Sequence, residues 1–350
     1  MTLPAVWFAI VAAMLAVYVV LDGFDLGAGL LTRFVARDDR ERRQVMRAIG
    51  PYWDGNEVWL LAAGGALVAA FPSLYARAFS GFYLPLMLVL WLLALRGVSI
   101  EFRNKAENAV WRPFWDTVFM GSSGLLALVF GVAIGNVVRG VPIDAEGRFF
   151  LPLFASGALT GLSEGALDLY TIGAGLLSLA ALAWHGALFL ALKAEGSVGE
   201  RARRLATRLS LAVAALTAAV TAATLFVQPR IAASLEARPW GAAFSLLAVG
   251  GLFASFLASR RGRFGRAFAG SSAYLAGMLA SVAFGLYPAV LPSRPFPERT
   301  LSVEAAAAAP YGLGVALYWW IPGMVLAAIY FVLVYRRLRG RVPLDEGEAH

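Results

Sequence analysis

The stretch Trp53-Asp54-Gly55-Asn56-Glu57-Val58-Trp59 places two carboxylates and an amide directly before an apolar run that reaches Ala76. A second acidic pair, Asp22 and Asp25, interrupts the end of the preceding apolar run. A charged side chain at bilayer depth costs roughly 3 kcal/mol or more, so it usually faces a polar interior or a functional path. The role of these four acids is therefore the main question that the sequence raises.

The composition excludes a soluble fold. Of the 350 residues, 60% are hydrophobic and 15% are charged, whereas soluble domains carry about 25% charged residues. The mean hydropathy is +0.70. The chain has no cysteine, which excludes disulfides, thiolate metal sites and cysteine catalysis. In such a membrane protein the net charge of +8 reflects the loops and does not indicate a nucleic-acid partner.

Nine apolar runs predict an all-α polytopic membrane fold, because a helix needs about 20 residues to cross the hydrocarbon core. A tenth apolar stretch, Phe149 to Ser163, is shorter and contains a proline, which favours a re-entrant or interfacial segment. The nine runs are Pro4 to Leu31, Val58 to Ala76, Ala78 to Leu95, Thr117 to Val138, Leu169 to Leu192, Leu209 to Pro229, Pro239 to Ser259, Ala267 to Leu291 and Tyr311 to Tyr335.

The basic residues predict the orientation, because Lys and Arg concentrate in cytoplasmic loops. Of the 30 Lys and Arg residues, 23 follow the odd-numbered runs and 7 follow the even-numbered runs. We therefore expect the N-terminus outside and the C-terminus in the cytoplasm. A tenth crossing at Phe149 would reverse every later loop and largely cancel this asymmetry, so the count favours nine helices.

The nine helices are expected to pack as two four-helix bundles plus one peripheral helix. The resemblance of Ile172–Leu177 to Leu26–Leu31 suggests two related units. The units would span about 4–140 and 165–291, followed by a last helix at about 311–335. Together they form one transmembrane domain, 1–340, with a polar cytoplasmic tail at 341–350.

The two acidic pairs predict a polar notch that opens to the cytoplasm between the first two helices. Asp22 and Asp25 are three residues apart, as are Asp54 and Glu57, so each pair projects from one helix face. One interpretation makes these acids helix caps or ion-pair partners of nearby arginines. For Asp25 and Asp54 a proton relay or a cation site is favoured instead. The supporting polar and aromatic side chains are Trp53, Asn56 and Trp59. The charged loop between the pairs, Thr32 to Gly50, is expected to be mostly helical and solvated.

Other polar residues indicate structure more than chemistry. Arg96, Glu101 and Arg103 gather at the cytoplasmic end of the third run, where an Arg–Glu ion pair or lipid head-group contacts are expected.

Haem iron usually takes His, Cys, Met or Tyr as an axial ligand, and the chain has only two histidines. His185 lies in the middle of the fifth run and is interpreted as a core or lipid-interface histidine, while His350 ends a polar tail. No complete haem site is expected in this chain, and the sequence leaves open whether its acids hold a metal cation.

Specific residue strings are dense between Leu21 and Pro142. They include Gly23-Phe24-Asp25-Leu26-Gly27, Trp53-Asp54-Gly55-Asn56-Glu57-Val58-Trp59-Leu60, Phe79-Ser80-Gly81-Phe82-Tyr83, Glu101-Phe102-Arg103 and Gly135-Asn136. In these strings the chain resembles subunit II of the cytochrome bd-type quinol oxidases. Beyond Pro142 the resemblance depends on hydropathy, loop lengths and scattered matches such as Tyr287-Pro288.

The resemblance implies a heterodimeric, electrogenic terminal oxidase that oxidises quinol and reduces dioxygen to water. Subunit I of that family carries the b- and d-type haems, and subunit II supports it. A small single-helix subunit, membrane lipid and a bound quinone are further implied partners, and the plasma membrane of a bacterium or archaeon is the implied location. Asp25 and Asp54 match acids of the family's suggested proton pathway, with Asp22 and Glu57 beside them.

Two other functions are compatible with the sequence. Internal acids, glycine-rich helices and a possible repeat are also features of secondary transporters and ion-coupled carriers. A carrier's polar residues, however, should gather near the midplane between both halves, whereas the strong acids here lie in the first half near the cytoplasm. The other alternative is a purely structural assembly subunit without proton traffic.

Overall fold

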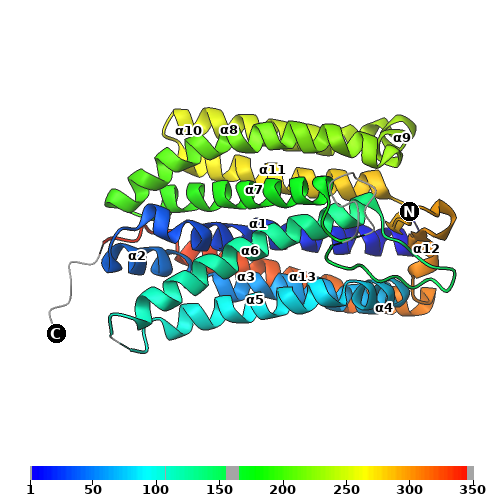
Figure 1. Cartoon of the computed structure of the whole chain (residues 1–350), viewed down its shortest axis with the longest axis horizontal. Helices are drawn as coiled ribbons and strands as arrows, with labels where there is room; N and C mark the ends of the chain where they lie inside the picture. The colour runs from blue at the N-terminus through cyan, green and yellow to red at the C-terminus, as the bar shows by residue number, and fades with distance from the viewer. Residues whose placement is uncertain (1, 107, 155–164, 345–350) are drawn as a thin grey trace.

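Long helices run side by side along the longest axis of the molecule (Figure 1). The structure is a computed structural model that describes residues 2–106, 108–154 and 165–344. The long helices are α1 (Leu3–Val35), α3 (Trp53–Ala70), α5 (Tyr83–Phe102), α6 (Trp111–Arg139), α7 (Leu169–Lys193), α8 (Gly196–Val227), α10 (Ala242–Arg260), α11 (Phe264–Leu286) and α13 (Pro310–Arg337). The shorter elements are α2 (Asp39–Ile49), α4 (Pro72–Gly81), α9 (Pro229–Ala237), α12 (Val303–Ala306), the 3₁₀ helices η1 (Pro239–Gly241) and η2 (Pro297–Arg299), and the antiparallel strands β1 (Ala289–Leu291) and β2 (Leu301–Ser302).

Eight helices of the described chain are long and apolar enough to cross a membrane. The remaining long helix, α3, has 18 residues and packs along α1. It falls outside that group because Asp54, Asn56 and Glu57 in its first turns lower its hydropathy. Each of the nine predicted apolar runs is thus mainly helical, and the all-α polytopic membrane class is confirmed.

The second predicted run, Val58 to Ala76, is divided between two helices. Helix α3 ends at Ala70, and α4 begins at Pro72. Proline lacks the N–H group that would continue the helix and disfavours the α conformation in the preceding residue. Phe71 accordingly leaves the helical region with φ −134° and ψ 63°. The next long helix, α5, therefore begins at Tyr83 and not at Ala78.

Helices α1 and α7 cross at direct backbone contact in the centre of the molecule. A Cβ atom added to Gly27 would lie 1.9 Å from the carbonyl oxygen of Leu182, and one added to Gly186 would lie 2.3 Å from the carbonyl carbon of Gly27. Small residues allow such close approach between membrane helices. Helix α1 also contacts α3 and α6, and α7 also contacts α8 and α11. The crossing therefore joins two halves of the bundle, one that contains α1, α3 and α6 and one that contains α7, α8 and α11.

The charged loops gather at one end of the bundle. Figure 1 shows α2 at this end, and α4, α9, α12 and the N-terminus at the other. The end of α6 and the start of α7 meet, since Arg139 Nη1 lies 2.6 Å from Asp168 Oδ2. The connection between α6 and α7 therefore starts and finishes at the same end of the bundle. The short segment predicted at Phe149 to Ser163 belongs to this connection, and its residues 155–163 lie outside the described residues.

Candidate functional site

Asp22 on α1 and Arg96 on α5 form a buried ion pair between the helices. Arg96 Nη1 donates to Asp22 Oδ2 at 2.8 Å, and Arg96 Nη2 donates to Asp22 Oδ1 at 2.6 Å. Both side chains are at most 1% exposed. This two-pronged geometry matches the planar guanidinium to the carboxylate. Glu57 on α3 completes a triad, with its Oε2 3.4 Å from Arg96 Nη2.

Asp25 lies one helical turn further along α1 and has a different environment. Its Oδ2 accepts a hydrogen bond from Asn56 Nδ2 at 2.7 Å, whereas its Oδ1 is buried without a hydrogen-bond partner among the described residues. The Asn56 amide is held on both sides. Its nitrogen also donates to the Leu21 carbonyl at 3.1 Å, and its oxygen accepts from the Tyr335 hydroxyl at 2.9 Å.

The charges in this cluster are balanced only in part. The Arg96 guanidinium neutralises Asp22 and partly offsets Glu57, but no cation of the described chain pairs with Asp25. An ionised carboxylate without a cation in a low-dielectric interior carries a large desolvation cost. Asp25 is therefore the acid in this cluster that is best placed to hold a proton. The cluster reaches the surface through Glu57, whose side chain is 21% exposed.

Asp54 does not join Asp25, contrary to the pairing expected from the sequence. Asp54 is exposed on α3, and within the described chain its carboxylate has no ion pair or hydrogen bond. The residue of α3 that reaches Asp25 is Asn56. Residues two apart on an α-helix point about 200° away from each other. With Asn56 facing α1, Asp54 therefore faces the outside of the described chain.

The two tryptophans of the stretch pack against other helices. Trp53 lies over Gly97 of α5, 3.5 Å from where a Cβ atom of Gly97 would be. Trp59 faces Phe331 of α13, with ring centroids 5.6 Å apart. Both rings thus pack α3 against its neighbours α5 and α13 beside the cluster.

Arg96 and Arg103 are buried in ion pairs, the first of the two roles expected for them, and not exposed to lipid head groups. Arg96 is 1% exposed and Arg103 is 0% exposed. Arg103 Nε lies 2.6 Å from Asp116 Oδ1, and its Nη2 lies 2.7 Å from Asp39 Oδ1. Glu101, the partner expected from sequence proximity, is exposed and pairs with neither arginine. Each arginine pairs instead with acids from other helices.

Helix α2 is docked on the bundle, and its charges are mostly engaged. The Glu41 carboxylate accepts from Arg201 Nη2 at 2.5 Å, from the Arg37 backbone N–H at 2.6 Å and from the Ser197 hydroxyl. Burial would raise the pKa of Glu41, but these hydrogen bonds outweigh it and lower the pKa to about 2. The helical character of this loop was predicted correctly. Its docking was not, although the spacing of Val45, Met46 and Ile49 could have indicated a buried face.

His185 is a hydrogen-bonded core histidine. Its Nε2 lies 3.0 Å from the Val20 carbonyl oxygen, and its Nδ1 lies 2.7 Å from Ser271 Oγ. The imidazole also stacks on Phe268 at 4.6 Å. With both ring nitrogens hydrogen-bonded to protein atoms, His185 does not fit the role of a haem ligand. His350 lies outside the described residues.

The far end of the bundle has a second buried polar cluster. Asp168 caps α7 by accepting the Thr171 backbone N–H at 2.8 Å, and it also binds Arg139. Asn136 donates to the Ala166 carbonyl at 2.9 Å and accepts from Arg139 at 2.7 Å. These contacts link the end of α6 to the start of α7, so this cluster is interpreted as structural.

The fold and the cluster define a class of protein: a polytopic helical membrane subunit with carboxylates buried between its helices. The profile of the cytochrome bd terminal oxidase subunit II family matches residues 3–338. The chain belongs to this family. It is therefore a multi-pass subunit of a membrane quinol oxidase complex in the bacterial inner membrane.

Similar proteins cover nearly the whole chain. The cytochrome bd-I ubiquinol oxidase subunit 2 of Escherichia coli (strain K12) is 33% identical over 98% of this chain and 96% of the relative. The cytochrome bd ubiquinol oxidase subunit 2 of Bacillus subtilis (strain 168) is 30% identical over 96% of both. A chain in the structure of bd oxidase from Geobacillus thermodenitrificans has the same fold, with a TM-score of 0.74, 20% identity and coverage of 96% of this chain and 98% of that one.

Proposed function

We propose that this chain is the subunit of a quinol:oxygen oxidoreductase that ligates no haem and supports a haem-bearing subunit I. Its family membership supports the complex and the partner. The hydrogen bonds on both nitrogens of His185 support placing the b- and d-type haems in subunit I. The asymmetry of basic residues supports nine spans with the N-terminus outside and the C-terminus in the cytoplasm. A small single-helix subunit and a bound quinone or lipid are further parts of this proposal.

The outer faces of α3 and α5 fit a large apolar partner. Leu61 on α3 is 72% exposed, and Trp91 on α5 is 61% exposed. Asp54 lies on the same helix as Leu61 and is also exposed. A carboxylate facing lipid would be costly, so an interface with subunit I explains this exposed acid better than a lipid boundary. The supporting role of the chain would then be exerted through this face.

In this proposal Asp25 is the central group of a proton pathway that enters from the cytoplasm. The observation that carries it is the free, buried Oδ1 of Asp25 beside the fixed amide of Asn56. A proton on Oδ1 removes the cost of an unpaired charge and can be passed on without breaking the bond to Asn56. Glu57 and Asp54 would connect the pathway to the surface of α3, while Asp22 remains paired with Arg96.

The test is to replace the two candidate acids in the intact complex. Asp25→Asn should lower quinol-dependent oxygen uptake about tenfold or more, because positioned proton transfer contributes roughly 10²–10⁴-fold to reaction rates. Asp54→Asn should cause a smaller loss, because Asp54 lies outside the buried cluster. The haem absorption spectrum should stay unchanged in both variants.

Glu101→Gln is the matched control, because Glu101 is an exposed acid near the same end of the bundle. It should keep normal turnover. If Asp25→Asn also keeps normal turnover and an intact haem spectrum, the cluster is structural and the chain is an assembly subunit. The carrier alternative receives no support from the family or from the placement of the acids, which lie among α1, α3 and α5.

A further inference from the structure

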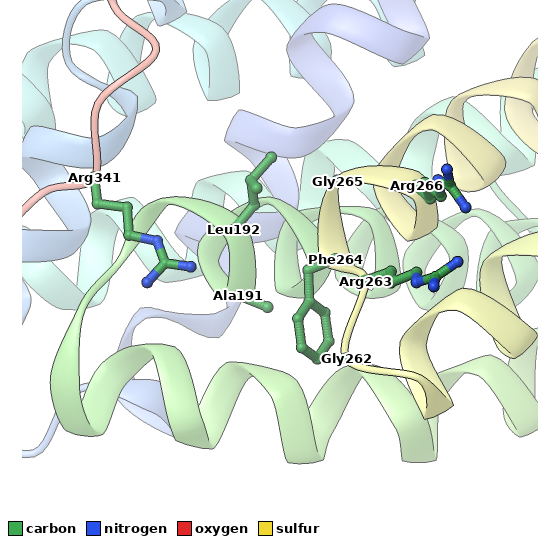
Figure 2. A pocket seen from close by; sticks show the side chains of 8 residues that line it. All are labelled: Ala191, Leu192, Gly262, Arg263, Phe264, Gly265, Arg266 and Arg341. Atoms are coloured by element: carbon green, nitrogen blue, oxygen red, sulfur yellow. The ribbon is translucent and has the colours of Figure 1, made fainter.

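A pocket of about 400 Å³ lies where α7 ends and α11 begins (Figure 2). Arg263 and Arg266 contribute to it from the start of α11, and Arg341 contributes from the segment that follows α13. The apolar side chains of Leu192 and Phe264 line the pocket between them. An open pocket lined by both apolar and basic residues is thus built from three segments that are far apart in sequence.

The three arginines of this pocket have no partner of opposite charge among residues 2–106, 108–154 and 165–344. Within the described chain none of their guanidinium groups forms an ion pair or a hydrogen bond. The arginines near α2 differ, because Arg103 and Arg201 each bind an acid. The segments 260–266 and 336–341 hold four arginines each and no acid. The pocket therefore has a local excess of positive charge that an anion would compensate.

The backbone adds to this positive field. Helix α11 begins at Phe264, and its N-cap residue, Arg263, makes no side-chain hydrogen bond to the first turn. The first N–H groups of a helix lack intrahelical partners and carry partial positive charge, which favours anions. Gly262, with φ +68°, forms the turn from α10 and leaves open space beside it. In Figure 2 the Arg341 side chain points toward Leu192 and Phe264, whereas Arg263 and Arg266 extend on the other side of Phe264. An anion in the pocket would meet Arg341 and the backbone N–H groups, and the long side chains of Arg263 and Arg266 would turn toward it.

We propose that this pocket binds the phosphate group of an anionic phospholipid. Guanidinium groups match phosphate oxygens in pairs, and basic pockets at the ends of membrane helices bind lipid phosphates. The lipid source follows from position, because α7 and α11 are both candidate membrane spans and the pocket lies at their ends. Leu192 and Phe264 would contact the start of an acyl chain. The site requires only the membrane location of the chain and is independent of the proton pathway.

The test compares two triple variants with the same change in net charge. The pocket variant is Arg263→Gln with Arg266→Gln and Arg341→Gln. The control is Arg260→Gln with Arg261→Gln and Arg339→Gln, which changes exposed arginines of the same two segments that do not line the pocket. The intact complex is exchanged into micelles containing phosphatidylglycerol or phosphatidylcholine, and bound lipid is counted by native mass spectrometry. A third arm adds inorganic phosphate alone.

The expected result is saturable retention of phosphatidylglycerol, but not phosphatidylcholine, by the wild type and the control. The pocket variant should bind phosphatidylglycerol at least tenfold more weakly. Equal loss in both triple variants would overturn the proposal, because net charge alone would then explain binding. If inorganic phosphate binds the complex but phosphatidylglycerol is not retained, the ligand would be free phosphate, and the assignment to a lipid would be overturned. If the pocket variant does not assemble, Arg341→Gln alone, outside the bundle helices, should still weaken retention at least threefold, and unchanged retention would refute the site.

Discussion

Asp22 and Asp25 are three residues apart on one helix, yet their carboxyl groups meet different partners. Asp22 meets the guanidinium of Arg96, and Asp25 meets the amide of Asn56. The spacing alone predicted that both side chains share a face of α1. It could not distinguish their partners, because these come from α3 and α5. At the scale of single residues, the pairing of Asp22 with Arg96 and the lack of a cation partner for Asp25 within the described chain are the basis for proposing different roles for the two acids.

Tyr335 on α13 fixes the orientation of the Asn56 amide together with the Leu21 carbonyl. Its hydroxyl donates to Asn56 Oδ1 at 2.9 Å, which leaves Nδ2 to donate to Asp25. Tyr335→Phe removes this donor, so the amide is held only by the two bonds that its Nδ2 donates to Asp25 and to the Leu21 carbonyl. One net hydrogen bond is worth about 0.5–1.5 kcal/mol, so we expect turnover to fall roughly twofold to tenfold. The pH profile of oxygen uptake should shift as well.

Tyr330→Phe is the control for this prediction. Tyr330 lies on the same helix, but it is 59% exposed and remote from Asn56. The same chemical change should therefore leave turnover and pH profile unchanged. If both tyrosine variants have the wild-type pH profile, Tyr335 has no positioning role and contributes only packing.

At the scale of elements, α2 acts as a clamp on one end of the bundle. Asp39 binds Arg103, the residue directly after α5, and Glu41 binds Arg201 of α8. Gln44 donates to the Val342 carbonyl at 2.7 Å and so holds the segment after α13. Burial opposes ionisation of Asp39, but hydrogen bonds and charges from Arg103, Arg43 and Arg112 lower its pKa. The acids of α2 are thus kept ionised as contacts between helices.

Glu41 provides a pH-dependent test of this clamp. Its pKa falls from an ordinary value of 4.5 to about 2 on folding. A depressed pKa means that its stabilising contribution is complete above pH 4.5 and is lost as the pH falls towards 2. Glu41→Gln should therefore lower the thermal unfolding midpoint at pH 7, by an amount equivalent to about 1–3 kcal/mol. The difference from the wild type should shrink at pH 3.

Glu200→Gln is the matched change on α8. Glu200 is 66% exposed, and its carboxylate lies 3.9 Å from Arg204. Exposed pairs of this kind contribute about 0–1 kcal/mol, so its midpoint should stay close to that of the wild type. A Glu41→Gln midpoint that differs from the wild type equally at pH 7 and pH 3 would show that the loss arises from packing and not from the charge.

At the scale of the whole molecule, the fold class was predictable and the contacts between helices were not. The apolar runs indicate where the long helices lie, and Pro72 accounts for the break between α3 and α4. Tyr335, by contrast, lies 279 positions from Asn56, and no local pattern links them. The same holds for Asp22 on α1, which lies 74 positions from its partner Arg96 on α5. Sequence periodicity specifies which face is buried, whereas the partner on that face is decided by the packing of distant helices.

The crossing of α1 and α7 tests how the two halves of the bundle depend on each other. Gly27→Ala would place a Cβ atom 1.9 Å from the Leu182 carbonyl oxygen, so the two backbones would have to separate. Overpacking of this kind costs about 1–3 kcal/mol or more, and α1 also carries Asp22 and Asp25. We expect a lower unfolding midpoint, a lower yield of assembled complex and a loss of turnover in what remains. The glycine of α10 at position 250 provides the control, because a Cβ atom there meets nothing within 4 Å. Gly250→Ala should be neutral or slightly stabilising, since alanine favours helix by about 1 kcal/mol over glycine. Equal midpoints for the two variants would mean that the helices can move apart at no cost and that the halves are only loosely coupled.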